Sequence, residues 1–479
     1  MELADVRCLA VLGLRRSGLP AALLARRRLP LARVTGLDEG TPPDSAKAEL
    51  EAAGVEVLIG PAARLPAAAD LLVKSPGVPN ESPVVRDALA RGVAVWSEVE
   101  FATRFLPNPL IGITGTNGKT TTTELAGAVF RDAGLPVAVG GNVGYALAAM
   151  PGAIADGAVV VAELSSFQLE HIERFHPAVG LLLNLTEDHV DRHGSYRAYA
   201  DAKLRLFERQ GSGDLALLNA DDPGTVAELE AGRIGGEGRR RWFSSRAGRS
   251  EGPGGAPLAA GVTAGGVLWL DLDALGAGGG RAELCPCGEL SLRGEHNLQN
   301  SLAAAAAACA CGAPAAAATA TLRTFAGVAH RLQVAGVVAG VTYVNDSKAT
   351  NVDATLKALT AYSGGVHLVL GGYDKGATYD ALAAACHGRI RRALLIGETA
   401  EGLAEAFARA AAAGRGTPCL RCGDLAAAVA AAARDAEPGD VVLLSPACAS
   451  WDQYRDYVER GEHFLRLVEE LGKRSATLS

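Results

Sequence analysis

Short apolar runs alternate with longer segments of helical periodicity along most of the chain. In the first hundred residues the apolar runs predict strands, and the stretch 20–28 predicts a helix. The predicted strands are 6–14, 33–37, 55–60, 71–74 and 93–96. Strands that alternate with helices in this way are typical of a parallel sheet covered by helices. The alternation stops at Pro107-Asn108-Pro109, which predicts a linker.

The same alternation begins again after this linker and once more near residue 328. Strands are predicted at 110–113, 158–162, 179–185 and 215–218, and then at 341–344, 366–370, 393–396 and 441–444. The Gly- and Arg-rich stretch 231–283 predicts hairpins and loops at a sheet edge. The alanine block 302–320 predicts a helix interrupted at Gly312 and Pro314. The pattern therefore predicts an α/β protein of three domains, 1–107, 108–327 and 328–479.

The composition narrows the class of protein. The chain has 479 residues, of which 49% are hydrophobic and 21% are charged, a balance typical of a globular protein. Its net charge of −7 and its 5% of aromatic residues argue against a nucleic-acid-binding surface. Apart from alanine-rich helical segments, no apolar run approaches the ~20 residues that span a bilayer, and the acidic start is unlike a signal peptide. We therefore expect a cytoplasmic protein that binds neither nucleic acid nor membrane.

The nine cysteines are odd in number and scattered, which favours free thiols in a reducing compartment. The pairs Cys285/Cys287 and Cys309/Cys311 are separated by one residue each, whereas structural zinc sites usually use wider spacing. Cys448 follows the predicted strand 441–444, but no histidine is recognisable as its partner. The sequence therefore favours a structural cysteine at this position over a nucleophile.

A glycine-rich turn follows the apolar run 110–113, and residues 112–123 read GITGTNGKTTTT. Glycines allow backbone N–H groups to close around phosphate oxygens, and the helix that begins at the turn adds its positive end. Lys119 supplies an ammonium group for terminal phosphates, and Thr120 a hydroxyl group for a magnesium ion. Ile113 stands where the common form of this loop has glycine. The segment predicts a nucleotide-phosphate site.

Polar residues follow the next two predicted strands. Glu163 comes after 158–162, where it is either a solvated acid or a ligand for Mg²⁺. The run 186–193 reads TEDHVDRH, and so many ionisable groups at one strand end are costly to place together without a ligand. From spacing alone, Lys203 is predicted to be a solvated lysine on a helix. Asn297 and Asn300 share a helix face and either read a nucleobase edge or, for Asn297, cap the helix.

Three later clusters also follow predicted strands. NDSKATN follows 341–344, GGYDK follows 366–370, and SPACASWDQY follows 441–444. Arg331 lies near the beginning of the third predicted domain. The carboxyl ends of parallel strands share one edge, so Lys348, Lys375 and Ser450 are expected to face a small anionic compound. In the first domain, the turn 13–18 (GLRRSG) is either a structural tight turn or a ligand loop.

Together these motifs resemble the Mur ligases over essentially the whole chain. The motif GTNGKTT is shared with the folylpolyglutamate synthetases. The other motifs restrict the resemblance to the Mur ligases, and they are ELSSFQL, NLTEDHVDRHG, GEHNLQN, NDSKATN, GGYDKG and SPACASWDQY. The resemblance implies a Rossmann-like N-terminal domain, a P-loop-type central ATPase domain with a mostly parallel sheet, and a Rossmann-like C-terminal domain. It also implies ATP-dependent addition of D-glutamate to UDP-N-acetylmuramoyl-L-alanine through an acyl phosphate, in peptidoglycan precursor synthesis. The alternatives are a related ligase for another amino acid and, less favoured, a non-catalytic nucleotide-binding regulator.

The resemblance also implies the roles of individual residues. Catalysis would depend on Lys119, Glu163, His189 and Lys203. Magnesium would be held by Thr120, Glu163, His189 and a carbamylated Lys203. ATP would be bound by Gly115, Thr116, Asn117, Gly118, Lys119, Thr120, Thr121, Asn297, Asn300, Arg331 and Asp346. The substrates would be bound by Arg16, Ser17, Leu37, Ser75, Asn142, Ser165, Gln168, Thr350, Lys375, Ser450 and Tyr457. The protein is expected to act as a monomer. Arg15 departs from the glycine expected in the first loop.

Overall fold

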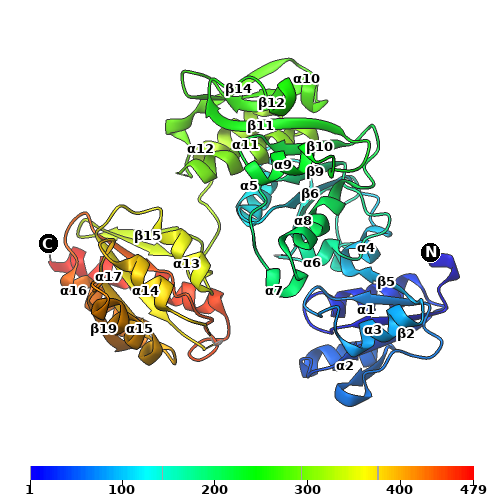
Figure 1. Cartoon of the computed structure of the whole chain (residues 1–479), viewed down its shortest axis with the longest axis horizontal. Helices are drawn as coiled ribbons and strands as arrows, with labels where there is room; N and C mark the ends of the chain where they lie inside the picture. The colour runs from blue at the N-terminus through cyan, green and yellow to red at the C-terminus, as the bar shows by residue number, and fades with distance from the viewer. Residues whose placement is uncertain (1, 143, 293, 375–376, 479) are drawn as a thin grey trace. The chain divides into compact units, whose positions relative to one another are not determined.

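The computed structural model describes residues 2–142, 144–292, 294–374 and 377–478 and divides into two compact units, Met1–Phe325 and Ala326–Ser479. The described residues of the first unit form a five-stranded and a nine-stranded sheet, and those of the second unit form a six-stranded sheet (Figure 1). Most neighbouring strands are parallel and helices cover the sheets, so the predicted α/β class is confirmed. The boundaries of the three predicted domains stay a prediction.

The N-terminal sheet is entirely parallel, with the strand order β3-β2-β1-β4-β5. Its strands are β1 (Cys8–Leu12), β2 (Arg33–Asp38), β3 (Glu56–Ile59), β4 (Leu71–Lys74) and β5 (Ala94–Ser97). Its helices are α1 (Gly18–Arg28), α2 (Asp44–Ala52), α3 (Pro83–Ala90) and α4 (Glu98–Thr103). Leu9 and Val11 pack into one apolar cluster and Ala10 and Leu12 into another, so β1 is buried on both faces. This burial explains its uninterrupted apolar sequence.

The central sheet has the order β14-β13-β12-β11-β10-β9-β6-β8-β7. It is parallel from β7 to β12, and β13 and β14 are antiparallel to their neighbours. The first strands are β6 (Leu110–Thr114), β7 (Val137–Gly141), β8 (Val159–Glu163), β9 (Val179–Leu182) and β10 (Leu215–Asn219). The others are β11 (Arg239–Ala247), β12 (Leu258–Val262), β13 (Val267–Asp271) and β14 (Arg281–Pro286). The predicted edge hairpins in 231–283 are therefore present, and this stretch also supplies the parallel strand β11.

Helices pack on the central sheet where the sequence is richest in alanine. The helices of this part are α5 (Lys119–Asp132), α6 (Ser166–Leu169), α7 (Val190–His193), α8 (Tyr196–Leu204), α9 (Pro223–Glu230), α10 (Leu272–Leu275), α11 (Glu295–Ala310) and α12 (Ala315–Thr324). The helices α11 and α12 both pack against α5, and the alanines 303–308 are completely buried there. The break between α11 and α12 contains Gly312 and Pro314, so the interrupted helix is confirmed.

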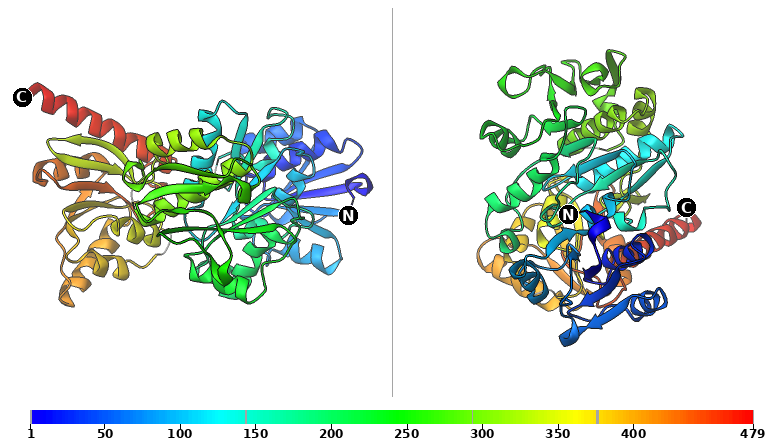
Figure 2. Two further views of the ribbon diagram at one scale, coloured as in Figure 1. Left: turned by 90° about the horizontal axis from the view of Figure 1, so that it is seen from above. Right: turned by 90° about the vertical axis from the view of Figure 1, so that its right-hand side faces the viewer.

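The sheet of the second unit has the order β15-β16-β20-β17-β18-β19, with β15 antiparallel and the rest parallel. Its strands are β15 (Gln333–Val338), β16 (Val341–Asn345), β17 (Val366–Gly371), β18 (Ile390–Ile396), β19 (Cys419–Gly423) and β20 (Val441–Leu444). Its helices are α13 (Val352–Leu359), α14 (Asp380–Cys386), α15 (Ala400–Ala412), α16 (Leu425–Asp435) and α17 (Tyr457–Leu478). The long helix α17, red in Figure 2, packs against β15 and β16. The edge strands β15 and β19 were not predicted, because Arg421 interrupts the short apolar run of β19 and Gly336 interrupts the β-branched residues of β15.

Candidate functional site

The predicted phosphate loop joins β6 to α5 in the central sheet. Gly118, at φ +84°, is the residue that precedes helix α5. A Cβ atom at this position would lie 2.3 Å from Oδ1 of Asn300 on α11, so the loop and α11 approach each other closely only because this residue is glycine. The backbone N–H of Asn117 donates to Oδ1 of Asn184 at 2.8 Å, which ties the loop to the end of β9. The loop is therefore held from two neighbouring elements.

Lys119 and the threonines of the first turn lie at this loop. The Nζ atom of Lys119 donates to the carbonyl oxygens of Gly115 and Thr116, each at 2.9 Å. The side chains of Thr120 and Thr121 are buried in the first turn of α5. A helix N-terminus with an ammonium group beside it is suited to phosphate oxygens.

Glu163 is the last residue of β8, which pairs with β6 so that Ile113 and Glu163 are in register. Its Oε1 atom accepts a hydrogen bond from Nδ2 of Asn142 at 2.9 Å. Its Oε2 atom is buried and has no hydrogen-bond partner among the described residues. The alternative that Glu163 is a solvated acid is therefore wrong. A buried carboxylate oxygen without a partner is suited to a divalent cation.

Lys203 lies on α8 and is 2% exposed, so the prediction of a solvated helix lysine is wrong. Its Nζ atom donates to the carbonyl oxygen of Gly115 at 2.8 Å, the same oxygen that Lys119 contacts. Burial holds the pKa of Lys203 well below its usual value, and the charge of Lys119 lowers it further. Asp188 and Glu163 act in the opposite direction. The site thus gathers two amines and two carboxylates beside the phosphate loop.

His189 lies nearby with an unusual backbone conformation, at φ +51°. Its side chain is 48% exposed, its Nε2 atom lies 3.6 Å from Oδ2 of Asp188, and its ring lies edge-on to Phe167 with the centroids 5.0 Å apart. The described part of the chain contains no group of three His, Cys, Asp or Glu side chains that could hold a metal by itself. A metal at this position would therefore need ligands such as a threonine hydroxyl, a modified lysine, water or the nucleotide.

Ser165 and Gln168 form a capping box at α6, in which the Gln168 side chain accepts from the backbone N–H of Ser165. Asn297 and Asn300 share a face of α11, and Nδ2 of Asn300 lies 3.3 Å from Oδ1 of Asn297. The residue that precedes this helix is Gly294, so the alternative that Asn297 caps the helix is wrong.

In the N-terminal sheet, Ser17 and Ser75 meet at the carboxyl end of β1. The hydroxyl of Ser75 donates to the carbonyl oxygen of Gly13 at 2.7 Å, and the hydroxyl of Ser17 lies 3.1 Å from that of Ser75. The side chain of Leu37 is buried, and its carbonyl oxygen accepts from the backbone N–H of Gly13. Nη2 of Arg16 donates to the carbonyl oxygen of Gly144 at 2.8 Å. Three of the four predicted side chains therefore lie near one rim, whereas Leu37 offers only its backbone.

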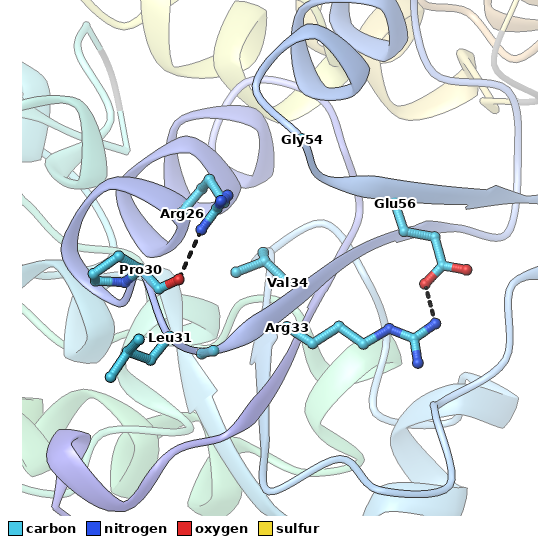
Figure 3. A pocket seen from close by; sticks show the side chains of 8 residues that line it. Arg26, Pro30, Leu31, Arg33, Val34, Gly54 and Glu56 are labelled. Atoms are coloured by element: carbon cyan, nitrogen blue, oxygen red, sulfur yellow. Dashed lines mark hydrogen bonds and ion pairs between the residues drawn. The ribbon is translucent and has the colours of Figure 1, made fainter.

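A separate hollow of about 630 Å³ lies at the opposite end of this sheet, where Arg33 begins β2 and Glu56 begins β3 (Figure 3). Arg33 donates to Glu56 at 2.8 Å, and Arg26 donates to the carbonyl oxygen of Pro30. Ligands of parallel α/β sheets bind at the carboxyl ends of the strands, so this hollow lies away from the candidate site.

In the second unit, Asp346 follows β16 and is buried. Its Oδ2 atom accepts from the hydroxyl of Ser445 at 2.7 Å, and its Oδ1 atom from the backbone N–H of Leu332 at 3.2 Å. Burial raises the pKa of Asp346 to about 6, and the two hydrogen bonds and Arg331 lower it only in part. Arg331 is exposed between His330 and Leu332, both of which have positive φ. These residues bring the ends of β16 and β20 together.

Ser450 and Tyr457 lie near a buried arginine that sequence reasoning missed. The guanidinium of Arg460 donates to the carbonyl oxygens of Ser347, Cys448 and Ala449 at 2.9, 3.1 and 3.2 Å. Burial lowers the pKa of Arg460 to about 10. The only sequence signal was its position three residues after Tyr457, which does not distinguish it from a surface arginine. Arg460 holds the loop that carries Ser450.

Three further residues complete the account of the second unit. Thr350 is half-buried and follows the same strand as Asp346. Lys375 lies outside the described residues. Cys448 is buried, its Sγ atom lies 3.4 Å from the hydroxyls of Tyr379 and Thr399, and burial raises its pKa. A protonated thiol is a poor nucleophile, so these contacts favour the structural interpretation of Cys448.

Comparisons with known proteins agree on one family. Residues 113–235 match the Mur ligase middle domain, and residues 330–448 match the Mur ligase glutamate ligase domain. The chain is 44% identical over 474 residues to the UDP-N-acetylmuramoylalanine--D-glutamate ligase of Solibacter usitatus, covering 98% of this chain and 99% of that protein. It is 42% identical to the protein of the same name from Pelotomaculum thermopropionicum, covering 97% of each.

Two solved structures share the fold at lower identity. A pseudomurein peptide ligase type C from Methanothermus fervidus is 17% identical, with a TM-score of 0.54, and the match covers 97% of this chain and 100% of that one. A UDP-N-acetylmuramate-alanine ligase from Thermotoga maritima is 18% identical, with a TM-score of 0.52, covering 96% and 99%. Among the described helices, none is both long and apolar enough to cross a membrane.

Proposed function

Because the chain belongs to the Mur ligase family, we propose that it joins D-glutamate to UDP-N-acetylmuramoyl-L-alanine at the expense of ATP, a step of peptidoglycan precursor synthesis. The substrate carboxylate attacks the γ-phosphorus and ADP leaves. The amine of D-glutamate then attacks the acyl carbon of the acyl phosphate, loses a proton, and phosphate leaves. The observation that carries the proposal is that Lys119 lies at the phosphate loop together with the buried side chains of Lys203 and Glu163.

The phosphate loop would bind ATP and neutralise the charge of the transferred group. The backbone of Gly115, Thr116, Asn117 and Gly118 and the first turn at Thr120 and Thr121 would surround the phosphates, and Lys119 would contact the terminal ones. When bound, Mg²⁺ supplies charge neutralisation between the phosphates. Thr120 and Glu163 would hold it, and the buried, unpartnered Oε2 atom of Glu163 fits this role.

Lys203 and His189 would hold a second Mg²⁺ through a carbamate on Lys203. A neutral amine is required to add to carbon dioxide, and burial favours the neutral amine of Lys203 by lowering its pKa. Lys203 also lies close enough to Glu163 and Asp188 to interact with their charges, so its carbamate would lie beside these two carboxylates. These observations support the carbamate as a proposal about this chain.

The remaining residues would bind substrates. Asn142, Ser165 and Gln168 would contact the muramoyl part, and Arg16, Ser17, Ser75 and the backbone of Leu37 the uridine diphosphate. Asn297, Asn300, Arg331 and Asp346 would contact the adenosine part of ATP. Thr350, Lys375, Ser450 and Tyr457 would receive D-glutamate, whose carboxylates suit an ammonium group and hydroxyls. We place the protein in the cytoplasm, where ATP is available and where its nine cysteines would stay free thiols, and we expect a monomer.

Phosphate release tests this function directly. We expect release only when ATP, Mg²⁺, UDP-N-acetylmuramoyl-L-alanine and D-glutamate are all present. L-Glutamate, L-alanine and a diamino acid, each supplied in place of D-glutamate, are the controls for the acceptor. Preference for one of them would assign a related ligase activity instead, and no release from the complete mixture by folded protein would overturn the proposal.

A further inference from the structure

A completely buried lysine lies beside the predicted substrate residue Ser75. Lys74 ends β4, its side chain is 0% exposed, and its Nζ atom donates to the carbonyl oxygen of Val78 at 2.8 Å. The same atom lies 3.7 Å from Oε2 of Glu170, which follows α6 in the central part of the chain. Burial lowers the pKa of Lys74 and raises that of Glu170. Removing both charges from water is costly, so this pair adds little net stability but is expensive to break on one side only.

Glu170 contacts more than one partner. Nδ2 of Asn80 donates to its Oε2 atom at 3.3 Å, and Nδ1 of His193 lies 3.4 Å from its Oε1 atom. The other end of the Asn80 amide, Oδ1, lies 2.9 Å from Nε2 of His171. Lys74 and Asn80 flank the loop 75–79 of the N-terminal sheet, whereas His171 and His193 belong to the central part. One carboxylate therefore joins the loop that carries Ser75 to two segments of the central part.

His193 continues this connection toward His189. Its Nε2 atom lies 3.0 Å from the hydroxyl of Ser166, and its ring stacks on Phe167 with centroids 5.1 Å apart and planes 3° apart. The edge-on contact of Phe167 with His189 then places the His189 ring. About half of the His189 side chain faces solvent, which by itself does not fix its position. Its packing against Phe167 therefore restricts this side chain, which extends from a backbone in the left-handed region.

We propose that Glu170 is a positioning residue, which holds the loop 75–79 and the side chain of His189 in a fixed relative position through Lys74, Asn80 and His193. This inference rests on the proposed function, in which Ser75 contacts the UDP-linked substrate and His189 holds a metal. A buried ion pair suits the task because only one arrangement satisfies both charges. The loop and the metal ligand then move together rather than independently.

Two double variants distinguish a positioning role of Glu170 from a contribution to the stability of the fold. The variant K74M/E170L removes both charges, so no buried charge is left alone, and it also removes the contacts to Asn80 and His193. The variant K74M/E170Q removes the charges but keeps an amide that can accept from Asn80 and donate to His193. The matched control is R33M/E56L, which removes an ion pair of the same N-terminal sheet whose side chains are 67% and 43% exposed.

We expect K74M/E170L to fold and to bind ATP as the wild type does. Its dissociation constant for UDP-N-acetylmuramoyl-L-alanine, measured by calorimetry without turnover, should rise about tenfold. The Mg²⁺ concentration that gives half-maximal phosphate release should rise by a similar factor. K74M/E170Q should stay within about threefold of wild type in both, and R33M/E56L within about twofold. A substrate affinity and Mg²⁺ requirement within about twofold of wild type in folded K74M/E170L would overturn the proposal.

A second variant covers the case in which K74M/E170L does not fold. His193→Phe keeps the ring that stacks on Phe167 but removes the contacts to Glu170 and Ser166. It should raise the Mg²⁺ requirement by about tenfold and the substrate dissociation constant by less, because Lys74 and Asn80 still contact Glu170. An unchanged Mg²⁺ requirement would contradict the connection to His189. Wild-type protein that binds the UDP-linked substrate but releases no phosphate would instead count against the proposed function, since the calorimetric comparison needs no turnover.

Discussion

Replacing Gly118 by alanine tests how closely the phosphate loop approaches α11. The new Cβ atom would lie 2.3 Å from Oδ1 of Asn300, a side chain that is buried and itself contacts Asn297. Asn300 would have to withdraw by about 1 Å to reach ordinary van der Waals contact. Gly118 also has φ +84°, where an L-residue costs about 1 kcal/mol.

Gly134 provides the matched control, because it follows the other end of the same helix. It has φ +67°, but a Cβ atom there would meet nothing within 4 Å. Gly134→Ala should therefore show the backbone cost alone, about 1 kcal/mol. Gly118→Ala should show that cost together with overpacking of about 1–3 kcal/mol, so its loss of unfolding free energy should be at least about twice as large.

The two substitutions should differ most in activity. A displacement of about 1 Å at the phosphates costs up to about 100-fold in rate, so kcat/KM for ATP should fall by roughly this factor in Gly118→Ala and stay near wild type in Gly134→Ala. Phosphate release gives the kinetic values, and denaturant unfolding gives the free energies. Equal stability losses and equal kcat/KM for ATP in both variants would refute the reasoning that Asn300 limits the space at Gly118.

Two other predictions concern the phosphate-loop site, and a third concerns Glu98, the buried first residue of α4. Lys119→Ala should fold normally and lose about 100-fold or more of phosphate release, because its ammonium is a point charge for the transferred group; retained turnover would exclude that role. Lys203→Ala should lose turnover and regain part of it with added short-chain carboxylic acids, and full activity without them would contradict the carbamate. Burial raises the pKa of Glu98 to about 7 from 4.5. The stability that its protonated form contributes is complete below pH 4.5 and is lost as the pH rises to about 7. Glutamine cannot ionise, so the unfolding free energy of Glu98→Gln should rise relative to that of the wild type by up to about 3 kcal/mol between pH 5 and 8. A difference between the two proteins that does not change with pH would contradict the raised pKa.

The alternation of apolar and polar residues was enough to predict the three sheets. Each buried parallel strand must be apolar on both faces, so strands such as β1, β6 and β20 are visible as uninterrupted runs. The edge strands β7, β15 and β19 were not predicted. Arg421 interrupts the short apolar run of β19, whereas β7 and β15 are apolar but contain glycines, which also mark turns. The helix that begins at Lys119 was also predicted, since its start and end signals are local.

The sequence by itself determined the positions of most of the motifs, because strands that run parallel bring their carboxyl ends to one edge of a sheet, and most of the motifs follow such a strand. The segment 294–300 is an exception, because it follows the antiparallel strand β14. Only the tertiary structure decided the state of the side chains. Lys203 had the spacing of a surface lysine, yet it is buried against the carbonyl oxygen of Gly115, 88 residues earlier in the chain. The same holds for Lys74 and Glu170, whose charges are paired across two parts of the chain. Burial and pairing depend on residues distant in sequence, and the free energy of a charge depends on both, so no local pattern could reveal them.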